Sequence, residues 1–326
     1  MAVKAESFLV LEKSLSIRVG NAWDRAVSPV LAKIVKAVRE KNFNLATDLV
    51  YQIDMRPVVE KQKKFIILVG MGAALYGAAK TTTPRDSTLF RKTVPPEVRQ
   101  AADVLVEMLA EEGTKQARME AQKLIAAAEL SSTAGALKAD AAPFITGFPK
   151  LVKRAGRTMV DVGAGLHTSR LANWGYAVEA DARGKEFYKI SEQLDGRTCP
   201  VCRVMHGKVF PVRSALNKLE THLAVSDPND LKAIAEWPKQ NPAAVAALST
   251  MTTEQLIARG WDTPPFHPAC RGIMVNTSKT IAPDAFDRNQ QTPSDAAFVA
   301  SILKPSSTTP GAAVVVSTSD TGEPKQ

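Results

Sequence analysis

The most informative part of the chain runs from Glu186 to Val212 and reads EFYKISEQLDGRTCPVCRVMHGKVFPV. Its Cys199 and Cys202 have the spacing at which one tight turn presents two thiolates to a single ion. Apolar, strand-favouring residues lie on both sides of the pair, and Asp195-Gly196 is a typical hairpin turn. We therefore expect the cysteine pair to lie on a small β element.

A second stretch, PPFHPACRGIMV from Pro264 to Val275, supplies two further ligand types at an equally compact spacing. His267 offers an imidazole and Cys270 a third thiolate. Zinc binds sulfur and nitrogen ligands tetrahedrally, and a catalytic zinc keeps one position open for water. A full set of four ligands, Cys199, Cys202, His267 and Cys270, therefore predicts one structural Zn²⁺.

Other uses of the three cysteines have less support. A redox pair needs its first thiol at a helix N-terminus, whereas this pair leads into a strand-like run. A zinc deaminase needs His-x-Glu and Pro-Cys-x-x-Cys, and neither occurs in the chain. Simple burial of the cysteines as small apolar side chains remains an alternative. Their odd number argues against a disulfide framework and favours a reducing compartment.

The composition predicts a mainly helical α+β protein. The 326 residues are 45% hydrophobic but only 6% aromatic, and alanine is abundant, which favours helices over a sandwich or barrel. Apolar residues recur at helical spacing over 8–38, 46–53 and 95–130, and a further helix is expected around 134–142. Pro29 is expected to kink or end the first helix, and the second should stop before Pro57.

Three regions follow from this pattern. Residues 1–150 are expected to form a helical N-terminal unit, and residues 151–280 a small α+β unit that carries the zinc motif. A capping box of Thr252 and Gln255 and a helix stop at Gly260 indicate that the insertion between the two half-motifs is helical. Residues 281–326 are expected to form an extended or flexible tail, because Ser, Thr, Pro and Gly dominate its end.

The most apolar segment is too short for a stable membrane span. Phe65 to Ala79 reads FIILVGMGAALYGAA and lies between two lysines, whereas a spanning helix needs about 20 apolar residues. A buried helix is the expected structure. Transient insertion into a membrane remains an alternative.

Positive charge is concentrated in two blocks of the chain, whose formal net charge is +9. Residues 1–100 and 150–213 are basic, and the segments between and after them are mildly acidic. Basic surfaces bind the phosphate backbone of DNA without sequence preference, but the same lysines also suit a solvated helix face. Non-specific DNA contact is therefore one of two open interpretations.

The segment MVDVGAG, from Met159 to Gly165, imitates the glycine-rich turn of a nucleotide-binding or methyl-transferring α/β domain. Such a turn must lie between a strand and a helix. The apolar residues that follow fit one helix face better than a short helix and a new strand. A helix is therefore expected here, and a methyltransferase that binds S-adenosylmethionine is the enzyme alternative.

The cysteine-histidine region resembles a known family. The run LDGRTCPVCRVMHGKVF, followed later by PPFHPACRG, is similar to the bacteriophage head-morphogenesis family, the Mu F-like minor head proteins. The resemblance extends over about residues 166–275, is weaker over the N-terminal half and is absent from the tail. The matching motif positions are Asp195, Arg197, Thr198, Cys199, Cys202, Gly207, His267, Pro268, Cys270 and Arg271. Many members end the motif Cys-Arg-Cys, whereas Gly272 stands here in place of the last cysteine, which removes an alternative ligand.

The resemblance implies a structural role and no enzymatic activity. It implies a minor head protein, made in the host cytoplasm and retained in the virion, that contacts the portal protein and the major capsid protein during head assembly. A toxin-like transferase that uses such a domain as a carrier is a second enzyme alternative. Asp195, Arg197 and Arg271 flank the ligands and either orient them or are ordinary turn and surface residues.

Overall fold

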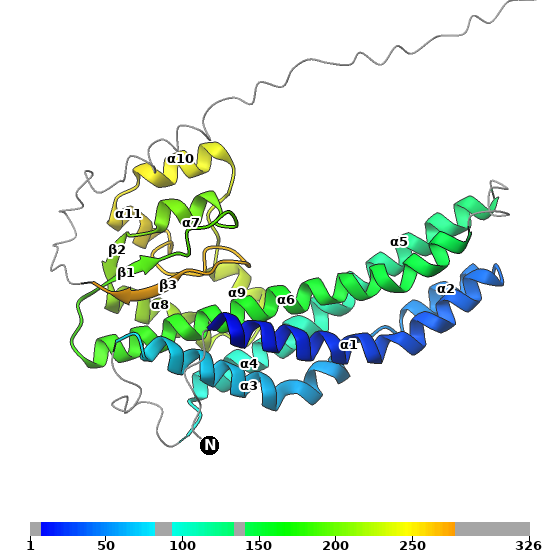
Figure 1. Ribbon diagram of the computed structural model, residues 1–326, viewed down its shortest axis with the longest axis horizontal. Coiled ribbons are helices and arrows are strands. Elements are labelled where there is room, and N and C mark those ends of the chain that lie inside the picture. The colour runs from blue at the N-terminus through cyan, green and yellow to red at the C-terminus, as the bar shows by residue number, and fades with distance from the viewer. Residues whose placement is uncertain (1–7, 82–92, 134–140, 278–326) are drawn as a thin grey trace, which may run out of the picture.

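The computed structural model describes residues 8–81, 93–133 and 141–277. Long helices lie side by side along one arm of the molecule, and a small sheet with several short helices packs at one end of that arm (Figure 1). This architecture confirms the prediction of a mainly helical α+β protein. The predicted tail, 281–326, lies outside the described residues, as does most of the helix expected around 134–142.

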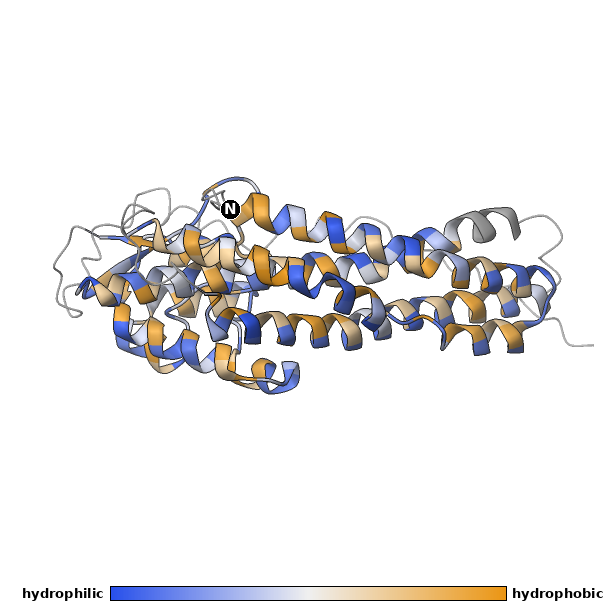
Figure 2. Cartoon of the chain, turned by 90° about the horizontal axis from the view of Figure 1, so that it is seen from below, coloured by the Kyte–Doolittle hydropathy of each residue, from blue (hydrophilic) through white to orange (hydrophobic). Residues whose placement is uncertain are grey.

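The helical arm contains six α-helices and one π-helical turn in the described part of the chain. They are α1 (Phe8–Arg39), α2 (Phe43–Val50), α3 (Arg56–Ala78), α4 (Pro96–Met108), η1 (Leu109–Gly113), α5 (Thr114–Thr133) and α6 (Ala141–Ala182). Apolar and polar faces alternate around these helices (Figure 2). Their apolar spacing predicted them well, although Pro29 lies inside α1 and does not end it, and Pro57 opens α3 within its first turn.

The C-terminal region consists of short elements. They are β1 (Phe187–Ser191), α7 (Pro200–Met205), β2 (Val209–Pro211), α8 (Val212–Ala224), α9 (Pro228–Ile234), α10 (Pro242–Thr250), α11 (Thr253–Ala258) and β3 (Ile273–Asn276). The strands form one antiparallel sheet in the order β2-β1-β3, with Tyr188 opposite Phe210 and Ile190 opposite Met274. The predicted capping box of Thr252 and Gln255 is present at the start of α11.

Buried apolar side chains gather in two cores. The bundle core joins α1 to α5, η1 and the first half of α6, and includes the fully buried Trp23 and Phe148. The second core joins the C-terminal halves of α3 and α6 to the sheet and the short helices, and includes Tyr188 and Phe266. The boundary predicted after residue 150 therefore falls inside α6, and the split into two separate units at that point is not confirmed.

Helices α3 and α6 approach each other so closely that only glycine fits at two positions. A Cβ atom on Gly77 would lie 1.7 Å from the carbonyl oxygen of Ala172, and one on Gly175 would lie 2.0 Å from that of Ala74. Both distances are far below van der Waals contact, so the two backbones touch directly. This crossing explains the glycine and alanine content of the apolar segment after Phe65.

That apolar segment is used inside the protein. Ile66 and Val69 are buried against the bundle, while Leu68 faces solvent with 61% of its surface exposed. Among the described residues, no helix combines the length and apolar character that crossing a membrane requires. The segment MVDVGAG lies within α6, and the residues that follow it continue that helix, as their apolar spacing predicted.

Candidate metal centre

The first ligand pair lies at the start of the short helix α7. Cys199 is the N-cap residue, in an extended conformation, and its Sγ accepts a hydrogen bond from the backbone N–H of Cys202 at 3.4 Å. Pro200 occupies the first turn, where its missing N–H costs no intrahelical bond. The strands β1 and β2 flank the pair, so the prediction that the cysteines themselves lie on a β element is wrong.

This position also corrects the sequence argument against a reactive thiol. Cys199 does lie at a helix N-terminus. Hydrogen bonds to its sulfur from Cys202, together with the nearby His267, lower the pKa of Cys199 to about 4. A thiolate at this position is the form that a metal ion binds.

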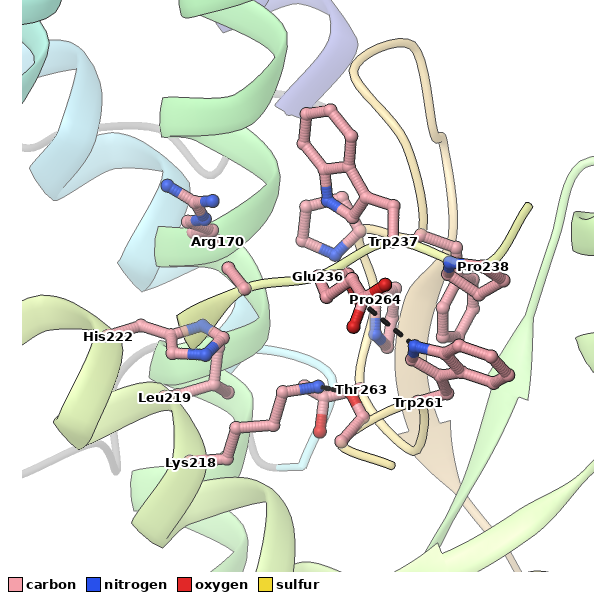
Figure 3. Close-up of a pocket in the computed structure, with 14 residues that line it drawn as sticks. Arg170, Lys218, Leu219, His222, Glu236, Trp237, Pro238, Trp261, Thr263 and Pro264 are labelled. Carbon is pink, nitrogen blue, oxygen red and sulfur yellow. Dashed lines mark hydrogen bonds between the residues drawn. The ribbon is translucent and has the colours of Figure 1, made fainter. Parts of the chain in front are cut away.

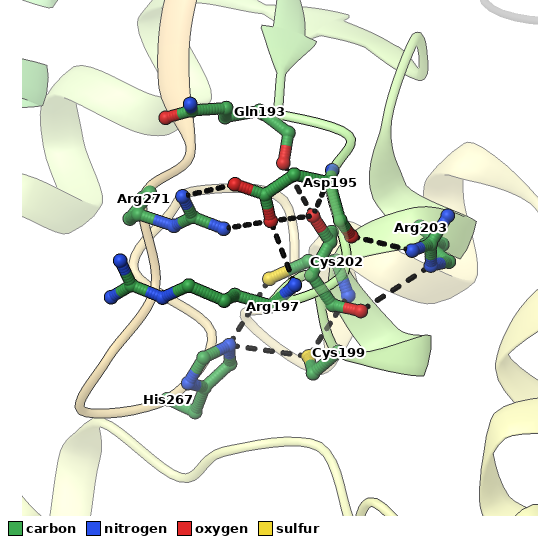
Figure 4. Close-up of polar contacts among 9 residues, drawn as sticks. Gln193, Asp195, Arg197, Cys199, Cys202, Arg203, His267 and Arg271 are labelled. Atoms are coloured by element: carbon green, nitrogen blue, oxygen red, sulfur yellow. Dashed lines mark hydrogen bonds and ion pairs between the residues drawn. The ribbon is translucent and has the colours of Figure 1, made fainter.

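The second half-motif folds back onto the first (Figure 4). His267 Nε2 lies 3.2 Å from the Sγ atom of Cys199 and 3.1 Å from that of Cys202. The Sγ atoms of Cys202 and Cys270 are 3.7 Å apart. In a tetrahedral zinc site, metal–ligand bonds of about 2.0–2.3 Å separate neighbouring ligand atoms by about 3.5–3.8 Å. The four predicted ligands are therefore together, at separations close to those of one metal site.

Glu192 is a fifth potential ligand that the sequence analysis missed. Its side chain is buried, and the thiol of Cys270 donates to its Oε1 at 3.5 Å. The ligand atoms form two overlapping groups that share Cys202: one with Cys199 and His267, the other with Glu192 and Cys270, each within 4.8 Å. Burial raises the pKa of Glu192 to about 7.

No spacing rule could have identified Glu192, because a single carboxylate after a strand is common in any sequence. Glu192 is identified only by its position in the folded chain, where its carboxylate occupies the space beside Gly272. A Cβ atom on Gly272 would lie 2.2 Å from Oε1 of Glu192. The absence of a side chain at residue 272 therefore makes room for the carboxylate beside Cys270.

One side of the cluster is closed to solvent, whereas Cys199 and His267 are half-buried. Only 2% of Cys202 and 3% of Cys270 is exposed. Hydrogen bonding to the neighbouring thiols and burial raise the pKa of Cys202, so without a metal ion the cluster retains protons. A soft divalent ion would displace those protons and compensate the buried sulfur charge.

Asp195 and Arg271 tie the two half-motifs together. The guanidinium of Arg271 donates to both carboxylate oxygens of Asp195, at 2.6 and 2.8 Å. Asp195 also accepts the backbone N–H of Arg197 at 2.8 Å, and these bonds hold its pKa well below the usual range. The side chain of Arg197 is exposed, so the structure brings two of the three predicted flanking residues together through their side chains and the third through its backbone.

The loop around the first cysteine is braced further by Arg203. Its guanidinium donates to the backbone carbonyl of Asp195 at 2.7 Å and to that of Thr198 at 3.3 Å (Figure 4). The Thr198 hydroxyl in turn accepts the Asp195 N–H at 2.9 Å. These contacts fix the approach of the chain to Cys199 without using its sulfur.

Asn173 on α6 hydrogen-bonds to the backbone of the second half-motif, and the sequence did not indicate this role. Its amide nitrogen donates to the backbone carbonyls of Pro264 at 3.3 Å and Gly272 at 3.4 Å, and its oxygen accepts the N–H of Met274 at 2.9 Å. The side chain is 1% exposed. The long helix therefore supports both ends of the segment that carries His267 and Cys270.

The arrangement suits a tightly held metal ion. Three sulfurs, one imidazole and one carboxylate converge, all are buried or half-buried, and their supporting contacts are short. Such a donor set fits zinc among the biological metals. No known protein family, curated protein or solved structure matches this chain.

Proposed function

We propose that this protein is a bacteriophage minor head protein, a structural component that contacts the portal protein and the major capsid protein during head assembly and remains in the virion. The observation that carries the proposal is the convergence of the two half-motifs. The 64 residues 203–266 separate them in the chain. The two half-motifs are also the segments that carry the resemblance to the head-morphogenesis family. Assembly in the host cytoplasm accords with three free thiols.

Zinc is the ion that we propose for the centre. Cys199, Cys202, His267 and Cys270 would hold it, with Glu192 beside Cys270 as a further oxygen donor. The ion would supply a cross-link between β1–α7 and the loop before β3, two segments that no disulfide joins. Its proposed role is the stability of the C-terminal region, because the four ligands come from two segments that are distant in the chain.

The enzyme alternatives receive less support from the geometry. A methyltransferase needs the glycines of DVGAG in a turn between a strand and a helix, where backbone N–H groups meet the cofactor. Gly163 instead lies inside α6, where an added Cβ would meet Leu105 and Met108. No contact among the described residues favours the toxin-like transferase.

Non-specific DNA contact is a secondary part of the proposal. Lys61 and Lys64 on α3 are exposed, as expected for residues that meet phosphates or solvent. Binding to duplex DNA should weaken steeply with salt and show no sequence preference. Absence of binding at low salt would remove DNA from the partners.

The decisive experiment is to locate the protein in purified phage heads. Quantitative mass spectrometry should detect it at a constant ratio to the portal protein, and electron microscopy should place it at the portal vertex. Cys270→Ser should reduce its incorporation, because the C-terminal region loses its cross-link. Absence from heads, together with binding of S-adenosylmethionine by the purified protein, would instead favour the enzyme.

A further inference from the structure

A second functional feature lies away from the metal centre, in a hollow between α6, α8 and the loops that follow α9 and α11 (Figure 3). Most of its space, about 370 Å³ in all, is the open, solvent-filled mouth. Arg170, Lys218 and His222 line one side, and Trp237 and Trp261 line the other.

Arg170 is the unusual member of this group. Part of its side chain still reaches solvent, yet burial lowers the pKa of its guanidinium to about 10. Within residues 8–81, 93–133 and 141–277, the guanidinium makes no hydrogen bond and no ion pair. Burying a charge without a partner is costly, so proteins rarely keep one unless a ligand or a function compensates it.

The other charges around the hollow do not neutralise Arg170. Lys218 pairs with the buried Asp262, whose oxygen lies 3.5 Å from Nζ, and also donates to the carbonyl of Gly260. Asp262 accepts a further hydrogen bond from Ser214 at 2.8 Å. His222 is uncharged at neutral pH, because burial and the two neighbouring cations lower its pKa to about 3. Glu236 is exposed at the rim and forms no ion pair with Arg170 among the described residues.

We propose that this hollow binds a phosphate group, with Arg170 as its principal counter-charge. A guanidinium presents paired N–H donors that match two oxygens of a phosphate, and it binds such anions more strongly than neutral donors do. Lys218 is already paired with Asp262, so Arg170 is the unpaired cation of the hollow, and the indole N–H of Trp237 has no acceptor in the described part of the chain. The other tryptophan already has an acceptor, because the indole N–H of Trp261 donates to the backbone carbonyl of Glu236 at 3.1 Å.

The phosphate can belong to a free ion or nucleotide, or to a nucleic-acid strand. The indole rings at the mouth can stack on a base, which would add affinity for a nucleotide or an exposed single strand. Inorganic phosphate, a nucleoside monophosphate and a short single-stranded oligonucleotide therefore separate the sources. Equal affinity for the first two means that only the phosphate is contacted; tighter binding of the second or third identifies the base or the strand as part of the ligand.

The test uses the full, metal-containing chain and isothermal titration calorimetry with inorganic phosphate. Chloride and acetate at equal ionic strength control for screening and for carboxylate binding. Arg170→Met should weaken phosphate binding by about tenfold or more, since it removes the charge and keeps the apolar stem. Arg213→Met is the matched control, because Arg213 lies on α8 at the surface and pairs with Asp181. The proposal is wrong if acetate binds as well as phosphate, or if both variants behave alike.

Two further measurements distinguish a lost phosphate site in Arg170→Met from a folding defect. Without phosphate, Arg170→Met should unfold at a temperature no lower than the unsubstituted protein, because it removes an unpaired charge; earlier unfolding would mean that Arg170 has an internal partner and would overturn the proposal. Glu236→Gln should strengthen phosphate binding several-fold, because it removes a competing negative charge at the rim. Unchanged or weaker binding in Glu236→Gln would likewise contradict the site.

Discussion

The two cores of the molecule are stabilised in different ways. The bundle core consists of apolar side chains from long helices, which satisfy their own backbone hydrogen bonds. The second core also buries apolar side chains, but it is bordered by buried polar groups such as Asn173, Glu192 and Asp262 and by the cysteine-histidine cluster. Strands of three to five residues and a six-residue helix cannot hold themselves together. Short elements therefore need specific polar contacts and, we propose, a metal ion.

Removing the metal is the strongest test of this difference. A strong chelator, or Cys270→Ser, should loosen residues 186–276 while the bundle core stays protected, because structural zinc contributes on the order of 10–16 kcal/mol in small domains. Hydrogen–deuterium exchange should show the loss in β1, α7 and β3 and none in the first half of α6. Elemental analysis should find one zinc per chain before chelation.

The matching negative result is equally specific. Protein purified without added metal that contains less than half an equivalent of zinc, and whose exchange pattern a chelator leaves unchanged, would mean that the cysteines only pack. His222→Gln is a suitable control for the variant, because His222 is buried outside the cluster and should leave the zinc content intact.

A smaller loss of stability is expected from a substitution at the crossing of α3 and α6, the two helices that both cores share. Gly175→Ala would place a methyl group 2.0 Å from the carbonyl oxygen of Ala74 and force α3 and α6 apart. Overpacking of this kind costs about 1–3 kcal/mol, occasionally more, and should lower the free energy of unfolding measured in denaturant.

Gly147→Ala is the matched control in the same helix, since nothing lies within 4 Å of its added Cβ. It should stabilise the protein slightly, by about 0.5–1 kcal/mol, because alanine is the better helix former. If both substitutions change the free energy of unfolding in the same direction, the close crossing of α3 and α6 does not limit stability.

The smallest effect is expected at the ion pair that joins the half-motifs. Asp195→Asn keeps the shape of the side chain and removes its charge, so Arg271 loses its partner. Residues that orient metal ligands typically change metal affinity about 10–100-fold when replaced, and we expect about tenfold here, measured by competition with a chromogenic chelator. Asp181→Asn, which removes a surface pair with Arg213, should leave zinc affinity unchanged.

Sequence reasoning succeeded where a local pattern has one physical cause. Helical spacing of apolar residues predicted α1, α4, α5 and the part of α6 that follows the DVGAG segment, because an amphipathic helix has a single period. Ligand spacing predicted the four cluster residues for a similar reason, since only compact pairs can reach one ion. Pro29 does not end α1, because proline only disfavours a helix interior and the packing of α1 along the bundle outweighs that cost.

Residues whose partners are distant in the chain were not predictable in this way. Asn173, Glu192 and Arg170 carry no recognisable motif. Asn173 contacts Pro264, 91 residues away, Glu192 contacts Cys270, 78 residues away, and Arg170 faces side chains of other helices and loops. The same holds for the place where the two cores meet, which lies within α6 and α3 and not at a linker.

The amino-acid sequence alone was sufficient for the helical class, the small β component and the four sulfur- and nitrogen-bearing residues of the cluster, because each depends on residues within one turn or one helix face. Only the tertiary structure placed the cysteine pair at the start of α7, brought Glu192 beside Cys270 and left Arg170 unpaired in a hollow. These features depend on how separate segments pack. Packing is a collective balance of many contacts, and no short stretch of sequence contains it.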